Sequence, residues 1–264
     1  MSNVLEKIIK DKILSLDLIK RQNSIDSLEN KIKELKLFLN FKDAIKKNNG
    51  VSLISEIKKA SPSAGILVKN FNHIDLAKTY SESGATCLSV LTEEKYFLGK
   101  LEYIKDIKKN FKLPILAKDF FIDPYQVALS KSFGCDCILI ILAALNGKQA
   151  DEIYSEALKH NLSIIVEVHD QKEAELALKY KEAIIGINNR NLKTLDVSID
   201  NTISIFEIVK EHKSPLLSES GISSEKDAKY IFDKTGIKNF LIGESLLKSN
   251  NPKQLIKEIL EITQ

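Results

Sequence analysis

The chain opens with a helical pattern of apolar residues, which then gives way to short, almost continuous apolar runs. Between residues 3 and 47, apolar side chains recur every three or four positions, for example at Leu28, Ile32 and Leu35. This spacing is typical of amphipathic helices. Asn48-Asn49-Gly50 then interrupts the pattern, as turn sequences do. Residues 1–48 are therefore predicted to form a helical extension.

The rest of the chain alternates between predicted strands and predicted helices. The strands are runs rich in Val, Ile and Leu that begin about every 27 residues. The runs are almost continuously apolar, which indicates parallel strands that are covered on both faces. The predicted strands are 51–57, 86–91, 114–120, 137–142, 163–168, 183–188, 215–219 and 239–243.

Repeated helix-end signals support this alternation. Gly84, Gly134 and Gly236 each precede a strand, where a left-handed glycine would end the helix before it. Asp123-Pro124 and Ser224-x-x-Asp227 mark helix starts. Eight such units predict an α/β fold, a closed (β/α)8 TIM barrel with an N-terminal helical extension. An open doubly wound sheet is the alternative, but no G-x-G-x-x-G follows the first strand.

The length of the chain fits a single domain of residues 1–264, in which the barrel occupies residues 49–264. The apolar fraction of 44% is that of a soluble globular protein. No apolar run approaches the roughly 20 residues that span a bilayer, and the N-terminus does not resemble a signal peptide. We expect a cytoplasmic protein without a membrane partner.

The net charge and the positions of the Cys and His residues limit which partners and metals we expect this chain to bind. The net charge is +3, and the basic excess falls in residues 1–50, where both signs are mixed. We therefore expect a solvated helix surface and no nucleic-acid partner. Cys87, Cys135 and Cys137 are expected to be buried free thiols. The four histidines show no metal-binding spacing such as H-E-x-x-H, so no metal is expected. His169 follows a predicted strand and could line a site, but it is interpreted as an incidental loop residue.

Charged residues inside the apolar runs are the main pointer to function. Glu56, Lys118, Glu167 and Glu219 lie near the C-terminal ends of four predicted strands. A buried charge costs several kcal/mol unless it is paired or faces a wet site. Barrel enzymes place their active sites at these strand ends. We therefore predict that the four side chains share one site.

Further charged residues near the same ends suit acid–base chemistry on an anion. Lys58 and Arg190 join Lys118 and the glutamates. A lysine near other cations in a partly dry pocket should lose basicity and become a usable general acid. Structural ion pairing at the barrel mouth is the alternative interpretation.

The last two strand–helix loops are predicted to bind phosphate. Ser220-Gly221 is expected to open the helix after the seventh strand, and Gly243-Glu244 the short helix after the eighth. Backbone N–H groups at glycines and helix N-termini favour anions. The loops after strands seven and eight are also the usual phosphate site of barrel enzymes.

Six segments together resemble the indole-3-glycerol-phosphate synthase family. They are Ser55-Glu-Ile-Lys-Lys-Ala-Ser-Pro-Ser63, Leu91-Thr-Glu-Glu-Lys-Tyr-Phe97, Lys118-Asp-Phe120, Gly186-Ile-Asn-Asn-Arg-Asn-Leu192, Ser218-Glu-Ser-Gly-Ile222 and Leu241-Ile-Gly-Glu-Ser-Leu246. The resemblance implies a monofunctional carboxy-lyase of tryptophan biosynthesis. The substrate would be 1-(2-carboxyphenylamino)-1-deoxyribulose 5-phosphate, which closes to indole-3-glycerol phosphate with loss of carbon dioxide and water. It also implies no cofactor and a phosphosugar substrate as the partner. We expect a monomer.

The resemblance also implies roles for the individual residues. Lys118 is similar to the family's principal general acid and Glu167 to its acid–base counterpart, while Glu56 and Lys58 resemble the pair used in dehydration. The residues that would orient the substrate are Asn188, Arg190 and Glu219. Those that would hold the phosphate are Ser61, Ser220, Gly221, Gly243 and Glu244, and those that would pack on the anthranilate ring are Phe97, Phe120 and Leu192.

Two other functions are alternatives to this one. A phosphosugar isomerase such as phosphoribosylanthranilate isomerase would need a Cys/Asp pair, and Cys87 has no aspartate near the predicted mouth. A catalytically silent scaffold would have little use for Glu56, Lys118 and Glu167 at strand ends. Both alternatives fit the charge pattern less well.

Overall fold

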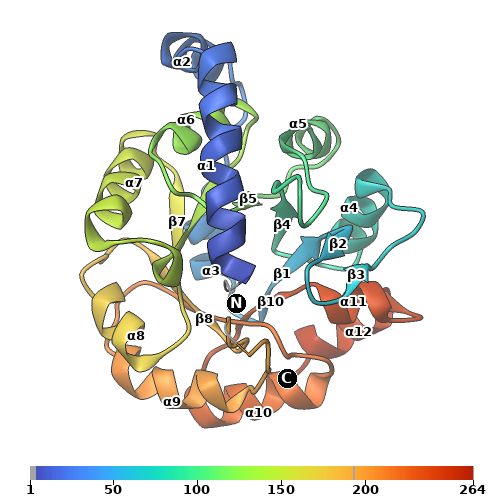
Figure 1. The fold of residues 1–264 in the computed structure, drawn as a ribbon. Helices are drawn as coiled ribbons and strands as arrows, with labels where there is room; N and C mark the ends of the chain where they lie inside the picture. Colours follow the sequence, from blue (N-terminus) through green and yellow to red (C-terminus); the bar gives the residue numbers. More distant parts are fainter. Residues whose placement is uncertain (1–3, 193, 264) are drawn as a thin grey trace.

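Eight parallel strands close into a barrel in the computed structural model, which describes residues 4–192 and 194–263 (Figure 1). Each barrel strand pairs with the strands before and after it, and the first pairs with the last. A separate antiparallel pair lies in the loop after the first strand. The barrel strands are β1 (Ser52–Ile57), β4 (Cys87–Leu91), β5 (Ile115–Lys118), β6 (Cys137–Ile141), β7 (Ser163–Val168), β8 (Ile184–Asn188), β9 (Leu216–Glu219) and β10 (Asn239–Ile242), and the pair is β2 (Ala60–Ser61) with β3 (Gly65–Ile66).

A ring of helices surrounds the barrel, and three further helices precede it (Figure 1). The leading helices are α1 (Val4–Gln22), α2 (Ile25–Lys33) and α3 (Phe41–Lys47). The others are α4 (His73–Glu82), α5 (Leu101–Asn110), α6 (Tyr125–Ser132), the 3₁₀ turn η1 (Leu142–Ala144), α7 (Gly147–Lys159), α8 (Gln171–Ala177), α9 (Asp200–Val209), α10 (Glu225–Thr235), α11 (Glu244–Lys248) and α12 (Pro252–Leu260).

The predicted (β/α)8 barrel with its helical extension is confirmed, and its strands show why the sequence pattern was informative. All positions of β1, β4, β6, β7 and β8 are buried, because helices cover one face of each strand and the barrel interior covers the other.

The glycines predicted to end helices have positive φ angles, and the three cysteines are buried free thiols. Within the described ranges, none of the helices is both long and apolar enough to span a membrane.

The N-terminal extension is held to the barrel by apolar and ionic contacts. Leu28 of α2 packs against Ala128 and Leu129 of α6. Helix α1 lies across the open end of the barrel (Figure 1), and Nζ of Lys12 is 2.5 Å from Oδ1 of Asp119, the residue after β5. This contact fixes α1 directly above the strand ends that carry the predicted site residues.

Candidate active site

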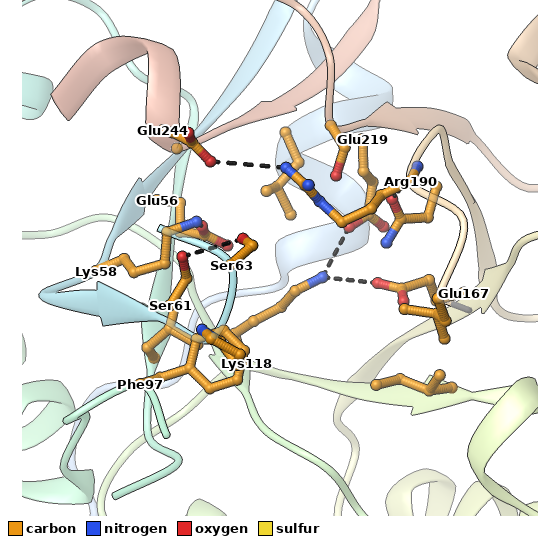
Figure 2. Close-up of a pocket in the computed structure, with 18 of the residues that line it drawn as sticks. Glu56, Lys58, Ser61, Ser63, Phe97, Lys118, Glu167, Arg190, Glu219 and Glu244 are labelled. Atoms are coloured by element: carbon orange, nitrogen blue, oxygen red, sulfur yellow. Dashed lines mark hydrogen bonds and ion pairs between the residues drawn. The ribbon is translucent and has the colours of Figure 1, made fainter. Parts of the chain in front are cut away.

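The charged residues predicted to share a site do converge at the C-terminal mouth of the barrel (Figure 2). Lys118 and Glu219 are the last residues of their strands, and Glu56 and Glu167 are the last but one. They line one cavity of about 200 Å³ together with Lys58, Asn188 and Arg190. The prediction that they lie together is confirmed by this arrangement.

Lys118 lies between two buried carboxylates at the centre of the mouth. Its Nζ atom is 2.7 Å from Oε2 of Glu167 and 2.7 Å from Oε2 of Glu219 (Figure 2). The Glu167 and Glu219 side chains are 3% and 2% exposed. Water can therefore do little to screen either contact, and the ammonium group is held in one position.

The expectation that this lysine loses basicity is wrong. Burial acts to lower the pKa of Lys118, but the negative charges of Glu167, Glu219 and Glu56 outweigh it and raise the pKa above its ordinary value. The neighbours of Lys118 are carboxylates rather than the cations that the sequence suggested. Lys118 is therefore a protonated, positioned acid whose proton is held by two bases.

The two carboxylates beside Lys118 differ in their affinity for a proton. Burial raises the pKa of Glu219 to about 7, with Lys118 opposing and the charge of Glu167 adding to the shift. Burial acts in the same direction on Glu167, but Lys118 and His169 overcome it and hold the pKa of that carboxyl well below its usual range. At neutral pH, Glu219 is therefore the carboxylate that can take up or release a proton.

Gly186 makes room for Glu219. A Cβ atom at this position of β8 would lie 2.3 Å from Oε1 of Glu219 and 2.9 Å from Cγ2 of Ile165. Both separations are shorter than a normal contact between heavy atoms. Only glycine at position 186 therefore leaves room for the carboxylate of Glu219. A glycine inside an apolar strand was the one sequence signal for this role.

Glu56 and Lys58 form a second ion pair at the edge of the mouth. Oε1 of Glu56 is 2.6 Å from Nζ of Lys58, and the side chains are 7% and 13% exposed (Figure 2). Gly243 lies against this pair, because a Cβ there would be 2.4 Å from Oε1 of Glu56. Base and acid are thus held close together on the first strand and the residue that follows it.

His169 is part of the site, contrary to its interpretation as an incidental loop residue. Its Nε2 is 3.1 Å from Oε1 of Glu167 and its Nδ1 is 3.1 Å from Oε2 of Glu173 on α8. Burial acts to lower the pKa of His169, but these two glutamates raise it to about 10. The imidazolium therefore supplies a second positive charge to Glu167, on the oxygen that does not face Lys118.

Replacing His169 with glutamine should weaken the pH dependence of stability on the alkaline side. The pKa of His169 is raised from 6.5 to about 10 in the folded protein. Its charge therefore stabilises the fold fully below about pH 6.5, and that contribution is lost as the pH rises to about 10. In denaturant titrations we expect the wild type to lose on the order of 2–4 kcal/mol more than His169→Gln between pH 7 and 10.

His212 provides a matched control for this measurement. Its Nε2 faces the carbonyl oxygen of Ala183 at 2.8 Å, which a glutamine side chain can also reach, so His212→Gln removes an imidazole ring without removing the ion pairs of His169. Parallel stability curves for the wild type and His169→Gln would show that folding does not raise the pKa of His169.

The residues predicted to bind phosphate lie on the loops after β1, β9 and β10. Ser220 and Gly221 have left-handed φ angles of 66° and 78°, and such a conformation in a non-glycine residue is characteristic of functional turns. The expectation that Ser220-Gly221 opens a helix is wrong, because α10 begins at Glu225 with Ser224 as its N-cap. Gly243 does precede the first residue of α11, as expected.

Polar side chains border these loops. Nη2 of Arg190 is 3.6 Å from Oε2 of Glu244 (Figure 2), and the backbone N–H of Arg190 donates to Oδ1 of Asn188 at 2.9 Å. Oγ of Ser61 lies 3.4 Å from Oγ of Ser63. All of these residues line the same cavity as Lys118. The structure thus lines the cavity of the central lysine with polar side chains from these loops.

Apolar side chains also line this cavity. The rings of Phe97 and Phe120 lie 6.2 Å apart with a 44° tilt, and Leu192 is a third apolar lining residue. Val4 and Ile8 of α1 also line the cavity. The helical period of residues 3–47 predicted the helix, but it did not indicate which of its apolar residues would face the cavity. A flat apolar group would be enclosed between the aromatic rings and α1.

The match to known proteins covers nearly the whole chain. The family model described as "Indole-3-glycerol phosphate synthase" matches residues 5–259. A relative of that name from Acinetobacter baylyi is 37% identical over 263 residues, covering 99% of this chain and 97% of the relative. Another, from Polaromonas sp., is 43% identical over 201 residues, covering 76% and 75%.

Solved structures share the barrel at low sequence identity. A 3-hexulose-6-phosphate synthase from Salmonella typhimurium superimposes with a TM-score of 0.64 at 14% identity, over 80% of this chain and 97% of that chain. The tryptophan synthase α subunit from Legionella pneumophila has a TM-score of 0.61 at 15% identity, covering 88% and 97%. These similarities support the fold alone, whereas the sequence matches show that the chain belongs to the indole-3-glycerol phosphate synthase family of enzymes.

Proposed function

We propose that this chain converts 1-(2-carboxyphenylamino)-1-deoxyribulose 5-phosphate into indole-3-glycerol phosphate, carbon dioxide and water. The observation that carries the proposal is the central Lys118, held at 2.7 Å from both Glu167 and Glu219. The cavity is lined by glycine-bearing loops with polar side chains and by two aromatic rings. These two kinds of lining suit the phosphate and the anthranilate ring of the substrate.

Lys118 is the general acid of the ring closure. The aromatic carbon attacks the ribulose carbonyl, and the ammonium group of Lys118 gives a proton to the carbonyl oxygen as negative charge develops there. Loss of carbon dioxide then returns the electron pair to the ring, because the cationic ring-closed intermediate accepts it. A lysine fixed by two carboxylates supplies the position that such proton transfer requires.

Glu167 and Glu219 complete the proton transfers around Lys118. The pKa of Glu219 is raised to about 7, so its carboxyl group can return a proton to the lysine amine at neutral pH. Glu167 stays ionised between Lys118 and His169, and its negative charge holds the ammonium group of Lys118 in position for the transfer. Asn188 and Arg190 orient the substrate hydroxyl groups beside these residues.

Glu56 and Lys58 act in the dehydration. Their side chains lie 2.6 Å apart, so Lys58 can protonate the departing hydroxyl while Glu56 removes a proton. The phosphate lies between Ser61 and the loops of Ser220-Gly221 and Gly243-Glu244, held largely by backbone N–H groups. This position keeps the reacting carbon atoms at the centre of the mouth.

Every residue in this proposal belongs to one chain, so the site is complete in a monomer, which we propose is the active form. An isomerase mechanism is not supported. Cys87 is the first residue of β4, at the end of the barrel opposite the mouth, and burial raises the pKa of its thiol. A thiol in that place cannot exchange protons with a substrate at the mouth.

Incubation of the purified chain with the carboxyphenylamino substrate tests the proposal. We expect indole fluorescence to rise with one carbon dioxide released per indole formed. Lys112→Ala, at an exposed lysine just before β5, should match the wild type. A folded wild-type chain that forms no indole would refute the proposed activity.

A further inference from the structure

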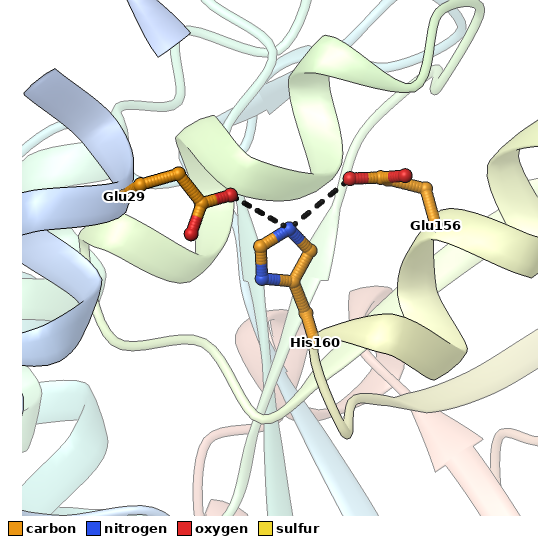
Figure 3. Close-up of side chains that lie close together, drawn as sticks. All are labelled: Glu29, Glu156 and His160. Carbon is orange, nitrogen blue, oxygen red and sulfur yellow. Dashed lines mark ion pairs between the residues drawn. The ribbon is translucent and has the colours of Figure 1, made fainter. Parts of the chain in front are cut away.

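A second cluster of side chains able to bind a ligand lies outside the barrel mouth. Glu29 of α2 meets Glu156 of α7 and His160, the C-cap residue of α7 (Figure 3). In the part of the chain that the structure describes, these residues form the one group of His, Cys, Asp and Glu whose ligand atoms all lie within 4.8 Å of one another. The reaction at the mouth makes no use of them.

The geometry around His160 differs from that of an ordinary ion pair. Its Nε2 atom is 3.4 Å from Oε1 of Glu29 and 3.3 Å from Oε1 of Glu156. Charged N–H···O bonds are usually about 2.7–2.9 Å long. Among the described residues, none forms an aligned hydrogen bond with this nitrogen, and the ring directs it between the two carboxylates (Figure 3). A single N–H proton satisfies neither oxygen in this arrangement.

The two distances from Nε2 match those between neighbouring ligands of one metal ion, and the three ligand atoms all lie within 4.8 Å of one another. A tetrahedral zinc ion with bonds of about 2.0–2.2 Å separates neighbouring ligand atoms by about 3.3–3.6 Å. We propose that Glu29, Glu156 and His160 bind one divalent transition-metal ion, with Zn²⁺ as the best match, which links the N-terminal extension to the barrel. An imidazole nitrogen among the ligands favours Zn²⁺, Co²⁺ or Ni²⁺ over Mg²⁺ and Ca²⁺, which prefer oxygen ligands.

The neighbouring residues orient one of the three ligands and leave the site open to ions from solvent. Nζ of Lys159 is 2.8 Å from Oε2 of Glu156, so it holds the oxygen that does not face His160, as outer-shell partners of metal ligands do. The side chains of His160, Glu156 and Glu29 are 9%, 23% and 38% exposed. An ion can therefore enter from solvent, and water can fill the fourth position.

A metal ion at this site would attach the N-terminal extension more firmly to the barrel. Helix α2 already packs on α6 through Leu28, and α1 directly before it covers the active-site cavity with Val4 and Ile8. A bond from Glu29 to Glu156 and His160 adds a second attachment for α2. Because the metal binds the folded state, it should raise the melting temperature in proportion to its occupancy.

Calorimetric titration of the chelator-treated full chain with ZnCl₂ tests the proposal. We expect one Zn²⁺ per chain with micromolar affinity, a higher melting temperature with Zn²⁺, and no effect of Mg²⁺. His160→Gln and Glu29→Gln should each weaken Zn²⁺ binding by more than about tenfold, because each removes one of three ligands. Both variants should keep the wild-type melting temperature in the absence of metal to within a few degrees.

Two further variants separate this site from other places where Zn²⁺ could bind. Glu152→Gln changes an exposed carboxylate one turn earlier on α7 and should bind Zn²⁺ as the wild type does. His169→Gln, at the mouth, should also retain the high-affinity ion. Wild-type affinity in His160→Gln, or no binding by the wild type below millimolar Zn²⁺, would overturn the proposal.

Discussion

Lys118→Ala should lower kcat by about two to four orders of magnitude, as expected when a positioned general acid is lost. Lys118 is the cation shared by Glu167 and Glu219, so alanine also leaves two buried carboxylates without their partner. At least one of them will then take up a proton. Single-turnover measurements of indole formation should show the loss in the chemical step, with a much smaller change in KM.

Lys118→Arg distinguishes proton transfer from simple charge pairing. Arginine keeps a positive charge beside the two glutamates, but its pKa above about 12 prevents it from giving up a proton. We expect Lys118→Arg to be as inactive as Lys118→Ala while retaining a stability closer to the wild type. Recovery of turnover in the arginine variant would show that Lys118 contributes charge rather than a proton.

The barrel could be predicted from the sequence because its strands are buried on both faces. This environment produces the continuous apolar runs that give each strand position within one or two residues, as for β7 (Ser163–Val168). The end of β5 was predicted two residues too late, because the apolar run extends to residue 120 whereas the strand ends at Lys118. The apolar Phe120 belongs to the mouth rather than to the sheet.

The site could be predicted where charge interrupts an apolar run. Glu56, Lys118, Glu167 and Glu219 were found in this way, and the parallel barrel then required them to meet. The sign of the pKa shift of Lys118 could not be obtained from the same pattern. It depends on which charges lie within a few ångströms, and two glutamates rather than Lys58 or Arg190 occupy those places.

Other functional features leave almost no trace in the sequence. His169 follows a strand, but its protonation depends on Glu173, which approaches it from α8. The cluster at His160 includes Glu156 at a helical spacing of four, yet its third member, Glu29, comes from the extension. Contacts of this kind follow from how helices pack, which local periodicity does not determine.

Glu167→Gln should reduce kcat by about two to four orders of magnitude with little loss of folding. The amide keeps the shape of the side chain but lacks the negative charge that holds the ammonium group of Lys118 in position. Lys118 retains Glu219 at 2.7 Å, and His169 retains Glu173 at 3.1 Å, so neither buried cation is left unpaired. The unfolding transition near pH 7 should therefore stay close to that of the wild type.

The same variant has a second, independent effect on Glu219. The charge of Glu167 is one of the causes that raise the pKa of Glu219 to about 7, so its removal should lower that pKa. Carboxyl NMR or infrared titration of Glu167→Gln should show Glu219 ionising at a lower pH than in the wild type. Glu175→Gln, at an exposed position of α8, should leave both kcat and this titration unchanged. A fall of kcat in Glu167→Gln without a change in the titration of Glu219 would show that the two carboxylates do not share the proton. Lys118 would then have to regain its proton from a group other than Glu219.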